Sequence, residues 1–189
     1  MKRTILVTLA ALLLFSFTTL EPATWNLDKA HAKLGFSITH MMISEVEGSF
    51  NTFTSTVTSS KDDFSDAVVE MTADVSSVNT DNTSRDNHIK GEDYFDAAKY
   101  PTITFKSTSF KKIDDKNYKV TGNLTMHGVT KAVELNAFCN TGTHPRTNKP
   151  VAGFKITGKI KRSDFGVGSS TPMLGDEVKV NANAEFAKQ

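Results

Sequence analysis

The stretch Val178-Lys179-Val180-Asn181-Ala182-Asn183-Ala184-Glu185-Phe186 shows in its plainest form the pattern that decides the fold. Apolar residues stand at every second position with polar or charged residues between them, which is the period of a strand with one buried face. The same alternation recurs at 34–40, 67–75, 118–126 and 133–139. The sequence therefore predicts an all-β protein built from many half-buried strands.

Turn signals separate these runs and favour antiparallel pairing of neighbouring strands. Asp114-Asp115-Lys116-Asn117 and the Gly128 corner each stand between two alternating runs, as hairpin turns do. The segment near 80–99 departs from the pattern, because its apolar spacing fits a helix. We predict a short helical segment there, with its N-cap within Asn79–Asp81 and its end before Pro101.

The N-terminus has the pattern of a secretory signal peptide. Lys2 and Arg3 precede an apolar run from Ile5 to Phe17. This run is shorter than the ~20 residues that a transmembrane helix needs. We therefore expect residues 1–20 to be a signal peptide and 21–189 to form one domain, periplasmic or secreted, without a stable transmembrane anchor.

Composition excludes some classes of function. The chain has 22 Lys and Arg against 21 Asp and Glu, and its basic residues are dispersed, so the footprint of nucleic-acid binding is missing. Cys139 is the only cysteine, which excludes an intramolecular disulfide. Neither a Gly-x-Ser-x-Gly elbow nor a phosphate-binding glycine loop occurs. We expect no nucleic-acid partner and no catalytic activity.

Small residues on the inner face of several strands bear on whether the interior is hollow. They are Ala73, Gly122, Gly158, Ala182 and Ala184. A closed barrel of about eight strands has no exposed edges and can hold one small ligand in its lumen. Small inward residues would leave room for such a ligand, or they would accommodate bulky neighbours such as Phe105, Phe154 and Phe186. The alternation leaves both interpretations open.

The histidines carry the other chemistry that the sequence offers. They are His31, His40, His88, His127 and His144. No two of them have the i, i+2 or i, i+4 spacing by which one strand or helix brings metal ligands together. The sequence therefore predicts no metal site and no cofactor. We expect His31 and His40 to be hydrogen-bonded inside the barrel or at its rim.

A series of short motifs extends from Trp25 to Phe186. It comprises Trp25-Asn26-Leu27-Asp28 with His31, then 36–41, 46–50, 78–80, 85–90, 94–97, Tyr100-Pro101, 105–107, 121–131 and 162–166. In order and spacing this series resembles the YceI-like polyisoprenoid-binding family over nearly the whole mature chain. The resemblance implies an extended lipocalin-like antiparallel β-barrel, export to the periplasm and binding of a long isoprenoid or related amphiphile in the lumen.

On that interpretation, the inward residues are the candidate contacts of the lipid tail. We name Phe36, Ile38, Met71, Phe105, Leu124, Met126, Phe154, Ile156, Ala182 and Ala184. A polar or phosphorylated head group would need donors at the mouth of the barrel. Arg85, His88, Lys90 and Arg162 are candidates, and arginine suits phosphate best because its guanidinium binds in a bidentate way. Alternatively, Arg85 with Asp86 and Arg162 with Asp164 form local ion pairs or helix caps.

The function that these observations favour is a carrier, store or scavenger for an isoprenoid, a quinone or a fatty-chain amphiphile. Apolar contacts distinguish ligands poorly, since one methylene changes binding by only ~1–3 kcal/mol. Two alternatives stay open at this point. One is an enzyme that acts on such a lipid through His and Asp residues at the mouth. The other is a structural barrel whose lumen is filled by its own side chains.

Overall fold

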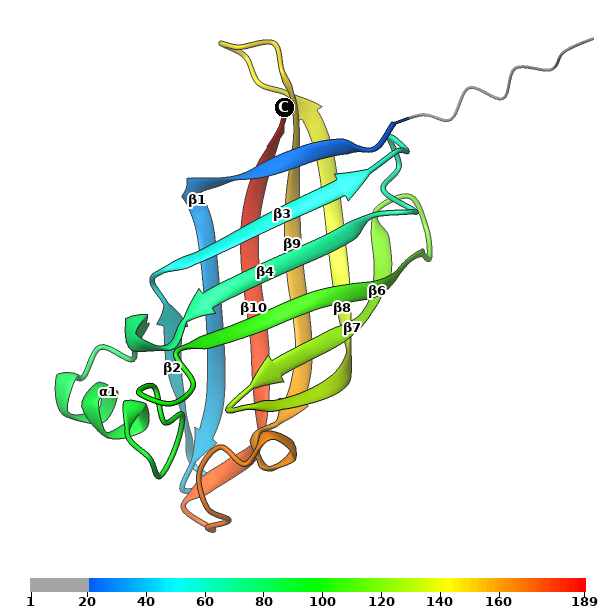
Figure 1. The fold of residues 1–189 in the computed structure, drawn as a ribbon. Helices are drawn as coiled ribbons and strands as arrows, with labels where there is room; N and C mark the ends of the chain where they lie inside the picture. Colours follow the sequence, from blue (N-terminus) through cyan, green and yellow to red (C-terminus); the bar gives the residue numbers. More distant parts are fainter. Residues whose placement is uncertain (1–20) are drawn as a thin grey trace, which may run out of the picture.

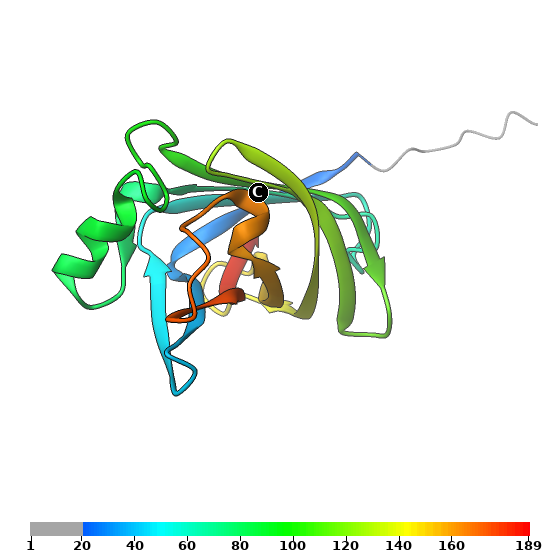
Figure 2. The same ribbon diagram turned by 90° about the horizontal axis from the view of Figure 1, so that it is seen from below.

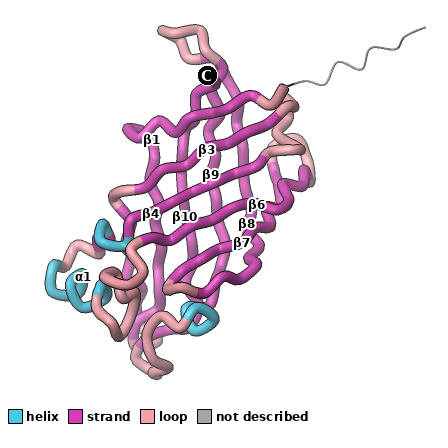
Figure 3. The backbone as a smooth tube through the Cα atoms, in the orientation of Figure 1, coloured by secondary structure: helices cyan, strands magenta, loops and turns pink. Residues whose placement is uncertain are grey.

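Strands account for most of the chain that the computed structural model describes, which is residues 21–189 (Figures 1 and 3). The predicted signal peptide, residues 1–20, lies outside these described residues. The elements are β1 (Ala23–His40), β2 (Ser44–Phe50), β3 (Phe53–Ser59), β4 (Val68–Asp74), the 3-10 helix η1 (Val75–Ser77), β5 (Val78–Asn79), α1 (Thr83–Lys90), β6 (Thr102–Lys112), β7 (Asn117–Met126), β8 (Val129–Thr143), β9 (Pro150–Lys161), η2 (Arg162–Phe165) and β10 (Leu174–Lys188).

Eight of these strands close into an antiparallel barrel. Their order around the ring is β1-β3-β4-β6-β7-β8-β9-β10, and β10 pairs back with β1. Figure 2 shows the ring from below. The two remaining strands, β2 and β5, extend the sheet alongside the second half of β1. The prediction of a lipocalin-like antiparallel barrel of about eight strands is confirmed.

The first strand bends sharply and takes part in two regions of the wall (Figure 1). Its first residues, 23–26, pair with β3, whereas 34–40 pair with β2. Its other edge pairs with β10, but the ladder passes from Asp28↔Glu185 directly to Ala32↔Ala184. The residues between form a bulge, and extra residues on one strand bend it. The bulge also changes the inward positions of β1 from odd to even numbers.

The helical segment is shorter than the prediction, and its N-cap was predicted wrongly. Asn82 is the N-cap, because its side chain accepts a hydrogen bond of 3.0 Å from the backbone N–H of Arg85. Asn79 ends β5, and Asp81 has a left-handed φ of 60°. After Lys90 the chain forms turns as far as Tyr100. In the part of the chain that the structure describes, no helix has the length and apolar character needed to cross a membrane.

Aromatic side chains fill one end of the barrel. Phe64, from the connection between β3 and β4, is 1% exposed, and its ring centroid lies 5.0 Å from that of Trp25 and 5.3 Å from that of Phe154. The Phe154 ring in turn contacts Phe186 at 5.8 Å and Phe110 at 6.2 Å, both edge-on. Each such pair contributes about 0.5–1.5 kcal/mol beyond its buried area. We call these five residues the aromatic plug.

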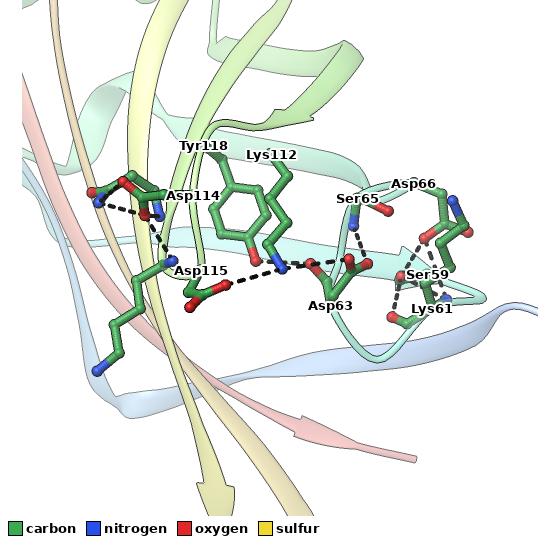
Figure 4. Close-up of polar contacts among 11 residues, drawn as sticks. Ser59, Lys61, Asp63, Ser65, Asp66, Lys112, Asp114, Asp115 and Tyr118 are labelled. Atoms are coloured by element: carbon green, nitrogen blue, oxygen red, sulfur yellow. Dashed lines mark hydrogen bonds and ion pairs between the residues drawn. The ribbon is translucent and has the colours of Figure 1, made fainter.

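Hydrogen bonds hold the connection that carries Phe64 (Figure 4). The carboxylate of Asp66 accepts from the hydroxyls of Ser59 and Ser60 and from the backbone N–H groups of Ser60 and Lys61. Burial alone would raise the pKa of Asp66, but these hydrogen bonds outweigh burial and lower the pKa to about 2. The ionised carboxylate therefore stabilises the turn behind the plug.

The hairpin between β6 and β7 holds the same connection from the other side. The hydroxyl of Tyr118 donates a hydrogen bond of 2.7 Å to the backbone carbonyl of Asp63, and Lys112 Nζ lies 3.6 Å from Asp63 Oδ2 (Figure 4). The Tyr118 ring also packs 5.0 Å from Phe110 of the plug. The plug is thus fixed both by packing and by polar contacts with a neighbouring hairpin.

We expect Asp66 to stabilise the protein above about pH 4 and to lose this effect as the pH falls toward 2. The reason is that its folded pKa of about 2 is lower than the ordinary value of 3.8. The contribution at pH 7 should be about 1–2 kcal/mol, allowing for solvent screening. Urea midpoints should be lower for Asp66→Asn at pH 7 and should approach those of the wild type near pH 2.

Asp62, an exposed residue of the same turn, provides the control. The Asp62→Asn variant should follow the wild-type midpoints at every pH. An Asp66→Asn variant as stable as the wild type at pH 7 would contradict the role assigned to this carboxylate.

Candidate functional site

The lumen is lined by layers of side chains from adjacent strands. Residues in register on neighbouring strands point to the same face of the sheet. One layer consists of Ala137, Ile156, Ala182 and Leu34. The next consists of Leu135, Gly158, Val180 and Phe36. The layer beyond consists of Ile160, Val178, Ile38 and Val46.

On β9 and β10 the inward residues change from buried at the aromatic plug to half-buried beyond it. On β9, Ala152 and Phe154 are 1% and 6% exposed, whereas Ile156 and Ile160 are half-buried. On β10, Phe186 is 4% exposed, whereas the inward residues from Val178 to Ala184 are half-buried. Solvent therefore reaches the inner faces of β9 and β10 beyond the plug. We call the end of the barrel at Ile38, Val178 and Ile160 the open end.

Pairing with Val180 and Val178 of β10 places Phe36 and Ile38 on the inward side of β1, and the alternation of burial places the other predicted tail contacts inward on their strands. Five of them, Phe36, Ile38, Ile156, Ala182 and Ala184, are half-buried on β1, β9 and β10. Phe154 belongs to the plug. The remaining four lie on β4, β6 and β7, where Phe105, Leu124 and Met126 are buried and Met71 is half-buried. Their contact with a ligand stays a prediction.

The small inward residues divide into two groups. Ala73 is fully buried, a Cβ added to Gly122 would lie 2.4 Å from Phe105 Cζ, and one added to Gly158 would lie 2.3 Å from Leu135 Cδ2. These three positions accommodate bulky neighbours, which was one of the two interpretations of the small inward residues in the sequence. Ala182 and Ala184, in contrast, stay half-buried. These two residues therefore stay accessible to solvent on the inner face of β10.

Arg162, one of the predicted head-group residues, is engaged by the backbone around it. Its side chain is 5% exposed, and Nε, Nη1 and Nη2 donate to the carbonyls of Gly175, Val167 and Leu174 at 2.9, 2.9 and 3.4 Å. These bonds hold the loop that leads into β10. Among the described residues Arg162 forms no ion pair with Asp164. Its contact with a head group stays a prediction.

Arg85 and Asp86 both bind Thr80 rather than each other. Arg85 Nε donates to Thr80 Oγ1 at 2.8 Å, and Nη2 donates to the Thr80 carbonyl at 2.7 Å. The Asp86 carboxylate accepts from the N–H and the hydroxyl of the same threonine at 2.8 and 2.6 Å. These bonds fix the start of α1 to the end of β5.

Contacts around Gly168 bring the α1 segment and the loop of Arg162 together. A Cβ on Gly168 would lie 2.8 Å from the Tyr94 ring and 2.9 Å from Arg162 Nη1. The Tyr94 ring packs edge-on against His88 at 5.0 Å. Two of the predicted head-group residues, His88 and Arg162, therefore lie on segments that meet. His88 is exposed, so its ring is accessible to a ligand.

Asp28, His31 and Glu185 form an exposed cluster of possible metal ligands on the barrel wall. The spacing of the histidines in the sequence did not predict this cluster. His31 Nδ1 lies 2.9 Å from Asp28 Oδ2 and 3.9 Å from Glu185 Oε2. The atoms by which the three residues could bind a metal ion lie within 4.8 Å of one another. The hydrogen bond between Asp28 and His31 raises the pKa of His31 and lowers that of Asp28. His31 is thus hydrogen-bonded as expected, and its side chain is exposed on the bulge of β1.

Two hollows lie where neighbouring strands of the wall separate. One of about 410 Å³ is lined by 65–68 and 107–111, beyond the last pair of β4 with β6, Glu70↔Lys106. The other, of about 220 Å³, is lined by Leu27, Lys29, Ala32 and 51–53, beside the bulge of β1. Neither includes the half-buried layers of the lumen, so they are separate from the candidate site.

A closed eight-stranded antiparallel barrel with an apolar interior, plugged at one end, defines a lipocalin-like protein. The family model described as the YceI-like domain matches residues 25–186. The chain belongs to the YceI-like family, as its motifs indicated.

Known relatives agree with this assignment. Protein YceI of Escherichia coli is 36% identical over 192 residues and covers the whole of both chains. The crystal structure of BcnA from Burkholderia cenocepacia has a TM-score of 0.75 at 27% identity, covering 84% of this chain and 98% of its own. A domain from Saccharophagus degradans, described as polyisoprenoid binding, shares the fold with a TM-score of 0.62 at 15% identity, covering 87% of this chain and 98% of its own.

Enlarging Ala182 should fill the lumen at low cost to stability, because this residue is half-buried beyond the plug. Ala182→Phe should therefore lose a bound lipid while its urea midpoint without lipid stays close to that of the wild type. The matched control is Ala137→Phe, in the same layer but 2% exposed. Overpacking there should destabilise by about 1–3 kcal/mol. Equal destabilisation of both variants would mean that this layer is fully packed.

Proposed function

We propose that this protein binds an isoprenoid, or a similar long-chain amphiphile, in the barrel lumen and carries or stores it outside the cytoplasm. The gradient of exposure along β9 and β10 is the observation that carries this proposal. On this proposal the half-buried inner faces of these two strands line the apolar space that takes up the lipid tail, and the plug closes one end of it. The polyisoprenoid-binding description of the Saccharophagus degradans domain supports the same class of ligand.

Burial of the tail supplies the binding free energy. A tail of about a dozen methylenes contributes on the order of 10 kcal/mol gross at ~0.8 kcal/mol each, before several kcal/mol of association and ordering costs. The half-buried lining consists of aliphatic and aromatic side chains such as Ile38, Phe36 and Ile156, which contact any apolar chain equally well. An isoprenoid, a quinone and a fatty chain are therefore all within the proposed range of ligands.

The head group of the lipid is proposed to lie near the meeting point of α1 and the loop of Arg162. His88 is exposed there, whereas Arg162 already donates to three carbonyls. A polar head would thus meet His88 more readily than it would meet the Arg162 guanidinium. This arrangement favours a head that stays in contact with water.

Binding rather than catalysis is the activity that we propose. At the end of the barrel near Gly168, His88 packs on Tyr94, and His127 packs on Tyr100 at 4.8 Å. The hydrogen bond between His31 and Asp28 lies on the bulge of β1, away from these two histidines. These three histidines therefore give no support to an enzyme that uses His and Asp at the mouth.

Purified protein should carry its ligand with it. We expect native mass spectrometry of the exported protein to show a hydrophobic small molecule that is released on collisional activation. Ala182→Phe should show less of it under the same conditions. Protein that is free of such a molecule, and that also fails to take up a polyprenol added in solution, would contradict the proposal.

Export should be visible at the N-terminus of the mature chain. If residues 1–20 are a cleaved signal peptide, N-terminal sequencing of protein from the periplasm or medium should start between Thr18 and Thr24. The matched control is the same chain without residues 2–20, which should stay in the cytoplasm. Intact Met1 in a membrane fraction would show that the segment is an anchor instead.

A further inference from the structure

Four apolar side chains are exposed together on two segments of the chain. Met41, Met42 and Ile43, in the turn between β1 and β2, are 45%, 78% and 83% exposed, and Met173, before β10, is 49% exposed. The backbone N–H of Met41 donates a hydrogen bond of 2.8 Å to the carbonyl of Met173, which holds the segments side by side. We call these four residues the apolar tip.

The apolar tip lies beside the open end of the lumen. Ile38, in the outermost layer of the lumen, stands three residues before Met41 and pairs with Val178. His40 pairs with Leu174, the residue after Met173. The β1–β2 turn and the segment before β10 also lie next to each other at the bottom of Figure 1 and in Figure 2. The apolar lining therefore continues outward onto an exposed surface.

Both segments of the tip lack charged side chains. No Asp, Glu, Lys or Arg occurs between Lys33 and Glu45, and none occurs between Asp164 and Asp176. Surface segments of soluble proteins are normally rich in charge, and contiguous exposed apolar residues mark a site of interaction. An uncharged, apolar surface can leave water without the cost of desolvating a charge.

The turn itself does not account for its methionines. Met41 and Met42 have left-handed φ angles of 51° and 62°, which hairpin turns usually give to glycine or asparagine. The β7–β8 turn of this protein follows that preference, with Gly128 at one of its two positive-φ positions. Two methionines in left-handed positions are unfavourable for folding, so their selection points to a role of the exposed side chains.

We propose that the apolar tip docks on a lipid bilayer, where its four side chains insert among the lipids and hold the open end against the membrane. This inference rests on the proposed function, since it explains how a lipid tail would move between bilayer and lumen without crossing water. A projecting tip fits a bilayer better than a protein partner. Four side chains offer far less than the roughly 1,200 Å² that a stable protein interface buries.

The test is co-flotation of the delipidated mature protein with vesicles of phosphatidylethanolamine and phosphatidylglycerol, and with vesicles of phosphatidylcholine alone. The variant Met42→Asn/Ile43→Ser removes the two most exposed side chains, and asparagine suits the left-handed φ at position 42. Its vesicle-bound fraction should fall about 10-fold or more, since two apolar side chains that would be buried in the bilayer are lost. Because the tip is uncharged, wild-type binding should be similar on both vesicles and insensitive to salt.

The matched control changes two exposed apolar residues at the plugged end. Ile113 and Phe138 are 58% and 37% exposed, and Ile113→Ser/Phe138→Ser should bind vesicles like the wild type. An equal loss in this control, or binding that requires phosphatidylglycerol and low salt, would overturn the assignment of the tip. Sedimentation showing that the tip instead joins two copies of the chain, with no vesicle binding, would overturn it as well.

Binding of a fluorescent polyprenol in solution separates this inference from the proposed function. The tip variant should bind the polyprenol like the wild type but should deliver it to vesicles more slowly. Wild-type protein that docks on vesicles without binding any polyprenol would refute the lipid-carrier function and leave the docking tip supported. Wild-type protein that binds polyprenol but not vesicles would refute the docking tip alone.

Discussion

The pairing of the first strand with the last is the constraint on which the rest of the structure depends. β1 and β10 are hydrogen-bonded from Trp25↔Lys188 to His40↔Leu174, and this ladder turns an open sheet into a ring. Closure leaves the eight strands of the ring paired on both sides, and it sets which residues face inward around the whole barrel. β1 can serve both regions of the wall only because its bulge lets it bend.

The part of the barrel that stabilises the fold and the part proposed to bind a ligand lie at different positions along the barrel axis. The plug packs aromatic rings around Phe64, which reaches the axis from a connection rather than from a strand of the wall. Hydrogen bonds of Asp66 and Tyr118 fix the backbone of that connection. On β9 and β10 the inward residues beyond the plug are only half-buried, so they contribute less burial to the fold. A ligand in that half would therefore add contacts without displacing the packing that maintains the fold.

Alternation along the strands predicted the fold class and the inward residues, because both depend only on local period and burial. It did not predict the bulge at Asp28–Ala32, since no glycine or proline marks it and the register with β10 is a long-range property. The division between Gly122, covered by Phe105, and Ala182, left half-buried, also depends on which side chains lie opposite. For the same reason the group of Asp28, His31 and Glu185 could not be seen from spacing alone.

If the lumen takes up a lipid tail as proposed, the plug gives it a blind end. From Val178 to Ala184 the inner wall spans about 20 Å of strand at ~3.3 Å per residue, which at a strand tilt of about 40° corresponds to a depth of roughly 15 Å. A chain longer than this depth would have to protrude, whatever its chemistry. Entry and exit would also use one opening, so the part of a molecule that enters last leaves first. A ligand would leave by the opening through which it entered rather than pass through the barrel. The segment that protrudes from the opening would determine how readily the ligand is withdrawn.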